Sequence, residues 1–247
     1  MNQLIIATSL TPKNIEIQLR AVDSWRNLGF KVVSINAPDE ISMIQGRFPD
    51  IEFVPAKRNG REKFGKPYIY FDDFLAYFKQ SESRICGIVN SDIHLLKEHF
   101  HSFISHEADN SLVYGSRVDV LSLENLNGAF YHEGFDYFFF DRGILPHYPS
   151  EEFCLGLPWW DYWALLIPLL NGVAVKKLTT PVAYHIDHPK NWNPHTWMYY
   201  GTRMSEFLNV SLGLTEDNLH IMNHKLLYFF KKRSQEIAFI EATGGNH

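Results

Sequence analysis

Short apolar runs alternate with longer segments of helical periodicity through the first third of the chain. Residues 4–7 and 31–35 are apolar runs of strand length, and a helical pattern from 14 to 28 separates them. A short helix is expected at 41–48 and a third strand at 51–54. This alternation is typical of βαβ units, so the pattern predicts a mainly parallel sheet.

The next two elements continue the alternation. Pro67 precedes an expected helix at 68–80, in which apolar residues recur at 71, 74, 75 and 78. The apolar run Ile85–Val89 then predicts a strand that stops abruptly at Asn90, Ser91 and Asp92. In open α/β sheets, ligands bind beyond the carboxyl ends of the strands. The three polar residues are therefore candidates for a ligand site.

The second half of the pattern is less regular. Strands are expected at 111–114, 118–121, 173–177 and 182–185, with a further apolar run at 137–140. Helices are expected from 161 to about 170 and from 219 to 240. No repeat or low-complexity linker divides the sequence, so a single domain over 1–247 is predicted.

Composition and charge exclude some classes of function. The net charge of −5 and the pI of about 6.2 argue against a dedicated nucleic-acid binder. Cys86 and Cys154 both lie in apolar stretches and are interpreted as buried thiols of a reducing compartment. No basic lead precedes the first apolar run, so no signal peptide is expected and a cytoplasmic location is predicted.

Asp92 is the first candidate for chemistry. A carboxylate at the end of a strand can face solvent or cap the next turn. It can also bind a hard cation, because divalent metals bridge protein carboxylates to the phosphates of a substrate. The basic loop 57–66, which contains Gly60 and ends at Lys66, is either a solvated loop or a contact for an anionic ligand.

Three tryptophans surround Asp161 in the stretch 156–163. Asp161 opens an expected helix, so helix capping alone would explain it. An aspartate walled by indoles can instead have a raised pKa and act as a general base. Trp159 and Trp160 would offer flat platforms for a sugar ring.

A second polar cluster follows the late strand at 182–185. His185 and His188 are three residues apart with Asp187 between them, and Lys190 follows. Imidazole groups can complete a metal shell, and a lysine can offset phosphate charge. In the aromatic stretch 134–141, Asp136 and Asp141 are candidates to contact the hydroxyls of an acceptor, against the alternative of an ordinary core strand.

The order of these motifs resembles that of GT-A-type glycosyltransferases, the nucleotide-diphospho-sugar transferase superfamily, over roughly residues 3–192. The stretches that carry the resemblance are GIVNSDI at 87–93, GFDYFFFDR at 134–142, LGLPWWDYW at 155–163 and AYHIDHPKNW at 183–192. The resemblance implies an α/β fold with a mixed, mainly parallel, Rossmann-like central sheet flanked by helices. It further implies a nucleotide-binding half at 1–110, an acceptor and catalytic half at 111–200 and a helical tail at 201–247.

The resemblance also implies roles for single residues. The family's Asp-X-Asp element, which binds Mn²⁺ or Mg²⁺ on the donor diphosphate, matches residues 90–92, where Asn90 replaces the first aspartate and Asp92 keeps the charge. His185, with His188 close behind, matches the late histidine of the metal shell. The catalytic base of inverting members matches Asp161. The implied donor-binding residues are Thr8, Asn36, Lys66, Asn90, Ser91, Asp92 and Lys190, and the acceptor-binding ones are Asp136, Trp159 and Trp160.

Three functions follow from this interpretation. The first is transfer of a sugar from a nucleotide-diphosphate sugar to a carbohydrate or other hydroxyl acceptor. The second is a nucleotidyltransferase or sugar-nucleotide hydrolase, and the third a non-catalytic carbohydrate-binding protein on the same fold. The basic, aromatic tail around Lys231 and Arg233 allows a contact with the inner membrane face, a homodimer or a plain surface helix.

Overall fold

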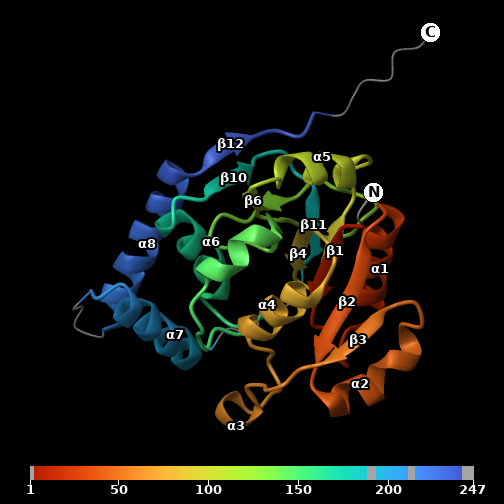
Figure 1. Ribbon diagram of the computed structural model, residues 1–247, viewed down its shortest axis with the longest axis horizontal. Coiled ribbons are helices and arrows are strands. Elements are labelled where there is room, and N and C mark those ends of the chain that lie inside the picture. Colours follow the sequence, from red (N-terminus) through yellow and green to blue (C-terminus); the bar gives the residue numbers. More distant parts are fainter. Residues whose placement is uncertain (1–2, 188–192, 211–214, 241–247) are drawn as a thin grey trace.

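The computed structural model describes residues 3–187, 193–210 and 215–240 (Figure 1). Within these ranges an eight-stranded sheet runs in the order β12-β10-β6-β9-β4-β1-β2-β3. Neighbouring strands are parallel except for β9, which is antiparallel to both β4 and β6. The bounds are β1 Ile5–Thr8, β2 Lys31–Asn36, β3 Glu52–Pro55, β4 Ile85–Val89, β6 Ser111–Gly115, β9 Tyr137–Asp141, β10 Ala174–Leu178 and β12 Gln235–Ile237.

Helices cover both faces of this sheet because its strands bury alternate residues on opposite sides. Phe138 and Phe140 of β9 join the core under one set of helices, while Tyr137 and Phe139 join the other core. The first face packs against α4 (Phe71–Gln80), α6 (Trp160–Leu170), α7 (Pro194–Phe207) and α8 (Glu216–Arg233), and the second against α1 (Ile15–Asn27) and α5 (Phe100–Glu107). The predicted mixed, mainly parallel α/β architecture is confirmed.

Helix α4 shows how the sequence pattern produces this packing. Phe71, Phe74, Leu75 and Phe78 recur at helical spacing and are all buried against the sheet. The helix begins at Phe71 rather than at 68, because the backbone of Tyr70 is extended and pairs with Cys154. Apart from this start, the expected helix is confirmed.

The end of the chain differs from the expected helix over 219–240. Helix α8 ends at Arg233, and Ser234 adopts an extended conformation while its hydroxyl bonds Tyr114 at 3.0 Å. The chain then adds β12 in parallel to β10. The prediction is wrong beyond Arg233, because the open edge of β10 supplies sheet hydrogen bonds that outweigh helical preference. Helices α5 and α7 were not predicted.

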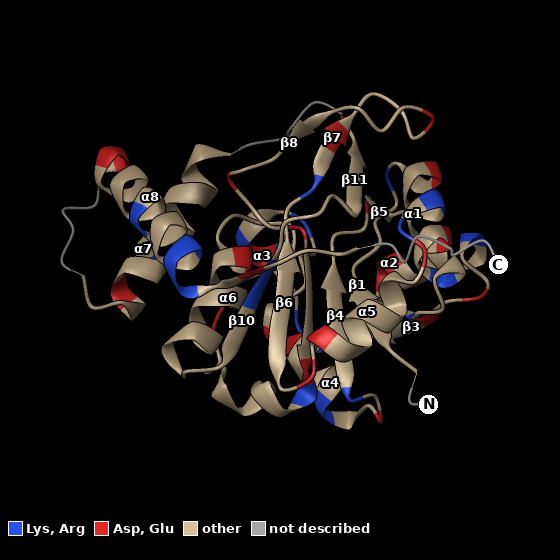
Figure 2. Cartoon of the chain, turned by 90° about the horizontal axis from the view of Figure 1, so that it is seen from above, with Lys and Arg blue, Asp and Glu red and all other residues tan. Residues whose placement is uncertain are grey.

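A smaller sheet contains much of the polar chemistry. Four strands are paired in the order β5-β11-β7-β8 among the described residues. It lies at the end of the molecule opposite α4 (Figure 2). Strands β7 and β11 are parallel neighbours, and their register places Asp119 beside His185. The bounds are β5 Ile93–Leu95, β7 Val118–Val120, β8 Ala129–Phe130 and β11 Ala183–Ile186.

The remaining helices are short and lie in the connections between the larger elements. Helix α2 spans Pro38–Ile44 and α3 spans Arg61–Phe64, with 3₁₀ turns at Gln45–Arg47 and Arg142–His147. No helix in the described ranges is both long and apolar enough to cross a bilayer. Cys86 and Cys154 are both buried free thiols, as expected.

We expect Phe78→Ala to lower the free energy of unfolding by about 3–5 kcal/mol, because it opens a cavity at a fully buried position between α4 and the sheet. Tyr228→Ala is the control, since that side chain is 64% exposed on α8 and its removal costs less than about 0.5 kcal/mol. Urea unfolding of both variants measures the difference. Equal effects would contradict the assignment of α4 to the core.

Candidate functional site

Polar residues gather at the carboxyl edge of the main sheet. Asn90, Ser91 and Asp92 follow β4 directly. Asp136 precedes the antiparallel strand β9 and therefore lies at the same edge. The backbone N–H of Asn90 donates to the backbone carbonyl of Asp136 at 3.0 Å, and the side-chain Nδ2 of Asn90 donates to Oδ1 of Asp136 at 3.1 Å. The asparagine at the first position of the triplet thus holds a neighbouring aspartate.

Arg117 links this edge to the small sheet. Its NH1 lies 2.7 Å from Oδ1 of Asp136, and its Nε lies 2.7 Å from Oδ1 of Asp119. The guanidinium lies over the Tyr131 ring, with its central carbon 4.2 Å from the ring centroid. The side chain is only 12% exposed, so its burial depends on these two carboxylates.

His185 lies between two more carboxylates. Its Nδ1 is 2.8 Å from Oδ1 of Asp119, and its Nε2 is 3.5 Å from Oδ2 of Asp92. Burial works against ionisation of Asp119, but hydrogen bonds from Arg117 and His185 hold the pKa of that carboxyl below its usual value. Ligand atoms of Asp119, His185 and Asp187 all lie within 4.8 Å of one another.

This donor set fits a divalent cation of the kind that the sequence predicts. Carboxylate oxygens with one imidazole nitrogen suit Mn²⁺ and Mg²⁺. In the network described above, the carboxylates of Asp92, Asp119 and Asp187 outnumber the permanent positive charge of Arg117, while burial raises the pKa of Asp136. A bound cation would offset that excess. His188 and Lys190 lie outside the described residues.

Asp161 lies at the start of α6 and is buried. Its Oδ2 accepts a hydrogen bond at 3.0 Å from the backbone amide of Phe135, the residue that precedes Asp136. Burial raises the pKa of Asp161 to about 7, and the nearby charge of Asp136 adds to the rise. A carboxyl group with this pKa is ionised in part at neutral pH, which suits a general base.

The two tryptophans expected to stack on a sugar are both buried in the core. Trp160 packs against Phe71 and Phe138, with ring centroids 6.3 and 5.2 Å away. Trp159 donates its Nε1 hydrogen to the backbone carbonyl of Trp197 at 3.0 Å and is 3% exposed. Trp197 is half-buried, with its ring centroid 4.5 Å from that of His220, so of the indoles at 159, 160 and 197 it is the most exposed.

Thr8 and Asn36, at the ends of β1 and β2, are fully buried. Asn36 donates from Nδ2 to the carbonyl of Leu10 at 2.6 Å and accepts from Ser34 at 2.5 Å. Its amide therefore fixes the loop after β1. Thr8 differs, because its Oγ1 has no hydrogen-bond partner within the described ranges.

Buried oxygens without a hydrogen-bond partner recur at this edge of the sheet. Within the described part of the chain they are Thr8 Oγ1, Asp73 Oδ2, Asp136 Oδ2 and the Tyr137 hydroxyl. Asp73 lies in the first turn of α4, and its Oδ1 accepts from the Lys57 backbone amide, two residues after the carboxyl end of β3. Because buried polar atoms are normally satisfied, these oxygens are candidate contacts for a ligand or an ordered water.

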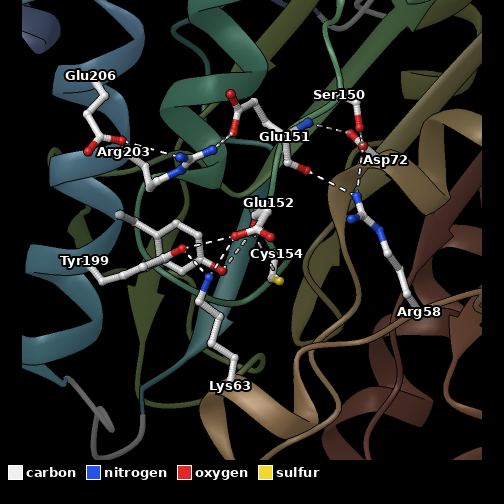
Figure 3. Close-up of polar contacts among 11 residues, drawn as sticks. Arg58, Lys63, Asp72, Ser150, Glu151, Glu152, Cys154, Tyr199, Arg203 and Glu206 are labelled. Atoms are coloured by element: carbon white, nitrogen blue, oxygen red, sulfur yellow. Dashed lines mark hydrogen bonds and ion pairs between the residues drawn. The ribbon is translucent and has the colours of Figure 1, made fainter.

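The basic loop 57–66 is held mainly by ion pairs to other elements. Figure 3 shows the contacts that join it to α4, to residues 150–154 and to α7. Arg58, Arg61 and Lys63 each pair with a carboxylate of this chain, although the sequence suggested that they could contact an anionic ligand. Lys66 is exposed. The pairs are Arg58–Asp72 at 3.0 Å, Arg61–Asp39 at 2.5 Å and Lys63–Glu152 at 2.7 Å.

Helix α7 is tied to the same segment. Arg203 lies 2.7 Å from Glu151, and the Tyr199 hydroxyl donates to Glu152 at 3.1 Å (Figure 3). The Tyr200 hydroxyl donates to the backbone carbonyl of Glu152 at 3.0 Å. These contacts fix the helix that carries Trp197 against the segment before α6.

Three residues of the network were not singled out as functional from the sequence: Arg117, Asp119 and Asp187. The stretch Arg117-Val118-Asp119 offered a signal, because two charges two residues apart point to one side of an otherwise apolar strand. Asp187 lies in the predicted His185–His188 cluster, where the histidines were preferred.

Comparison with solved structures identifies the fold. The Staphylococcus aureus protein TarS, residues 1–349 in complex with UDP-GlcNAc, is 14% identical, with a TM-score of 0.57 over 94% of this chain and 72% of that one. A mannosyltransferase from Pyrobaculum calidifontis, in complex with GDP-Man and Mn²⁺, is 12% identical, with a TM-score of 0.51 over 94% of this chain and 74% of that one. No protein-family model and no curated protein matches the chain. The predicted GT-A-like fold is confirmed.

We expect Asp161→Asn to gain stability relative to the wild type as the pH rises. The pKa of Asp161 is about 7 in the folded protein, whereas an aspartate in an unfolded chain has a pKa of about 3.9. Ionisation therefore costs the wild type on the order of 4 kcal/mol of unfolding free energy between about pH 4 and pH 7. Asparagine keeps an acceptor for the Phe135 amide and removes this cost.

Urea unfolding of both proteins at about pH 4.5 and pH 8 measures the effect. A stability difference that is the same at both pH values would show that the Asp161 carboxyl is hydrated.

Proposed function

We propose that the chain transfers a sugar from a nucleoside-diphosphate sugar to a hydroxyl acceptor with the help of a divalent cation. The observation that carries the proposal is one network at the carboxyl edge, in which Asp92 and His185 connect through Asp119 and Arg117 to Asp136. Asp161 lies beside this network. The two structural neighbours, which were solved with UDP-GlcNAc and with GDP-Man and Mn²⁺, support the assignment of the donor class.

Asp92, His185 and Asp187 would hold the cation, which is Mn²⁺ or Mg²⁺. When bound, the cation supplies positive charge that stabilises the departing diphosphate. Ser91 and the exposed Lys66 would contact the phosphates, and Lys190 is proposed for the same role. Each of these contacts is directed at charge that grows as the donor bond breaks.

Thr8 is proposed to contact the nucleoside part of the donor. Its buried hydroxyl lies at the end of β1 and offers an unpartnered oxygen, judged within the described ranges. Asn36 would act on the nucleoside through the shape of the loop after β1, since its own amide is bonded to Ser34 and Leu10. Asn90 would act on the donor through its position beside Ser91 and Asp92.

Asp161 is proposed to take the proton of the acceptor hydroxyl. A pKa of about 7 lets the carboxylate form and accept a proton at neutral pH. Direct displacement with this base inverts the configuration at the sugar carbon. The acceptor would lie between Asp136 and the start of α6, with Trp159 and Trp160 shaping its wall from the core.

We expect Asp161→Asn to lower kcat by about 10²–10⁴-fold, because general base catalysis contributes that much to rate. Donor binding, measured by calorimetry with UDP- and GDP-sugars, is expected to stay within about threefold of the wild type. The assay follows release of nucleoside diphosphate. Asp217→Asn, at an exposed position on α8, is the control and is expected to be fully active.

A kcat near that of the wild type would remove Asp161 from catalysis. Release of pyrophosphate in place of nucleoside diphosphate would show nucleotidyl transfer, and donor-independent sugar binding without turnover would show a carbohydrate-binding protein.

Metal removal provides a separate test. We expect EDTA to abolish transfer and added Mn²⁺ or Mg²⁺ to restore it, because the cation offsets both the carboxylates and the donor diphosphate. Asp92→Asn is expected to raise the Mn²⁺ concentration required for half-maximal rate by at least about tenfold. Full activity in EDTA would contradict a metal-dependent reaction.

A further inference from the structure

The contact between Asp119 and His185 differs from the contact between Asp92 and His185. We infer that Asp119 is a positioning residue, which orients the His185 ring so that Nε2 faces the cation, and that Arg117 holds Asp119 in place. This inference rests on the proposed metal-dependent function and specifies which residues bind the cation and which support them.

The two ring nitrogens have different partners. Nδ1 lies 2.8 Å from Oδ1 of Asp119, a normal hydrogen-bond length, whereas Nε2 lies 3.5 Å from Oδ2 of Asp92. Two ligand atoms about 2.1 Å from one ion at right angles are about 3 Å apart. The Asp92 separation is therefore close to that of two ligands on one ion.

A histidine binds a metal through one nitrogen and donates the hydrogen on the other to an acceptor. A hydrogen on Nδ1 donated to Asp119 would make Nε2, on the side of Asp92, the metal-binding nitrogen. Oδ1 of Asp119 also accepts from Arg117 at 2.7 Å, so two N–H donors already occupy this oxygen. A cation at Nε2 would therefore be bound at the ring nitrogen that Asp119 does not contact.

Arg117 holds Asp119 in place through an ion pair of 2.7 Å between Nε and Oδ1. One guanidinium contacts Asp119 through Nε and Asp136 through NH1, and Tyr131 covers its face. A lysine carries a single point charge on a flexible chain and cannot reproduce two contacts in a fixed fork. The position of Asp119, and with it the His185 ring, therefore depends on the shape of arginine as well as on its charge.

The register of the small sheet provides an independent reason for this pairing. Asp119 and His185 are direct neighbours in the parallel pair of β7 and β11. Their contact is built into the sheet, whereas Asp92 follows β4 of the main sheet and meets His185 from another direction.

The test measures Mn²⁺ binding by electron paramagnetic resonance of the free ion, without any sugar donor. Asp119→Ala is expected to weaken binding by about 10–100-fold, because it removes the partner of Nδ1. Asp119→Asn keeps an acceptor oxygen and is expected to restore a large part of the affinity. Arg117→Lys is expected to weaken binding less than Asp119→Ala, and Asp217→Asn is the control with unchanged affinity.

Long-range ¹H–¹⁵N spectra of the histidine-labelled chain with Zn²⁺ identify the bound nitrogen, with His185→Gln to assign the signals. The inference predicts metal at Nε2 and hydrogen at Nδ1 in the wild type. Metal at Nδ1, or wild-type Mn²⁺ affinity in Asp119→Ala, would overturn the inference and leave the proposed function intact. Absence of Mn²⁺ binding to the wild type, with and without UDP or GDP, would overturn both.

Discussion

Buried charge at the carboxyl edge of the sheet is the constraint on which the site depends. Arg117 is 12% exposed and Asp136 is 4% exposed at its side chain, so each side chain depends on the other as a polar partner away from water. Asp119 and Asn90 complete the set by bonding Arg117 and Asp136. This network connects the main sheet to the small sheet, and thereby places His185 beside Asp92.

The same constraint separates the tasks of the carboxylates. Two N–H donors keep the pKa of Asp119 below its usual value, while burial raises the pKa of Asp161 to about 7. One carboxyl thus supports the cation side and another is able to exchange a proton. Two acids with pKa values moved apart by their surroundings are a common arrangement at sites of acid–base chemistry.

Periodicity predicted the elements that depend on local pattern. The stripe Phe71, Phe74, Leu75 and Phe78 identified α4, and the run at 85–89 identified β4 and the polar triplet that follows it. The strand at 235–237 could not be predicted in the same way, because it depends on the open edge of β10, which is distant in sequence.

The site was predicted in part for the same reason. Asp92 and His185 follow recognisable strands, and the structure brings them to 3.5 Å. The roles of Arg117 and Asp119 depend on partners that are distant in sequence, Asp136 at 19 positions from Arg117 and His185 at 66 positions from Asp119. The tryptophans at 159 and 160 show the opposite case, since composition suggested a ligand wall and packing buried both rings.

The metal site is best tested by a crystal structure of the chain with Mn²⁺ and a UDP- or GDP-sugar, using the anomalous signal of manganese. We expect a manganese peak bound by Asp92 and by Nε2 of His185, in contact with the donor diphosphate at the carboxyl edge of β4. A manganese peak or a diphosphate away from these two side chains would contradict this expectation.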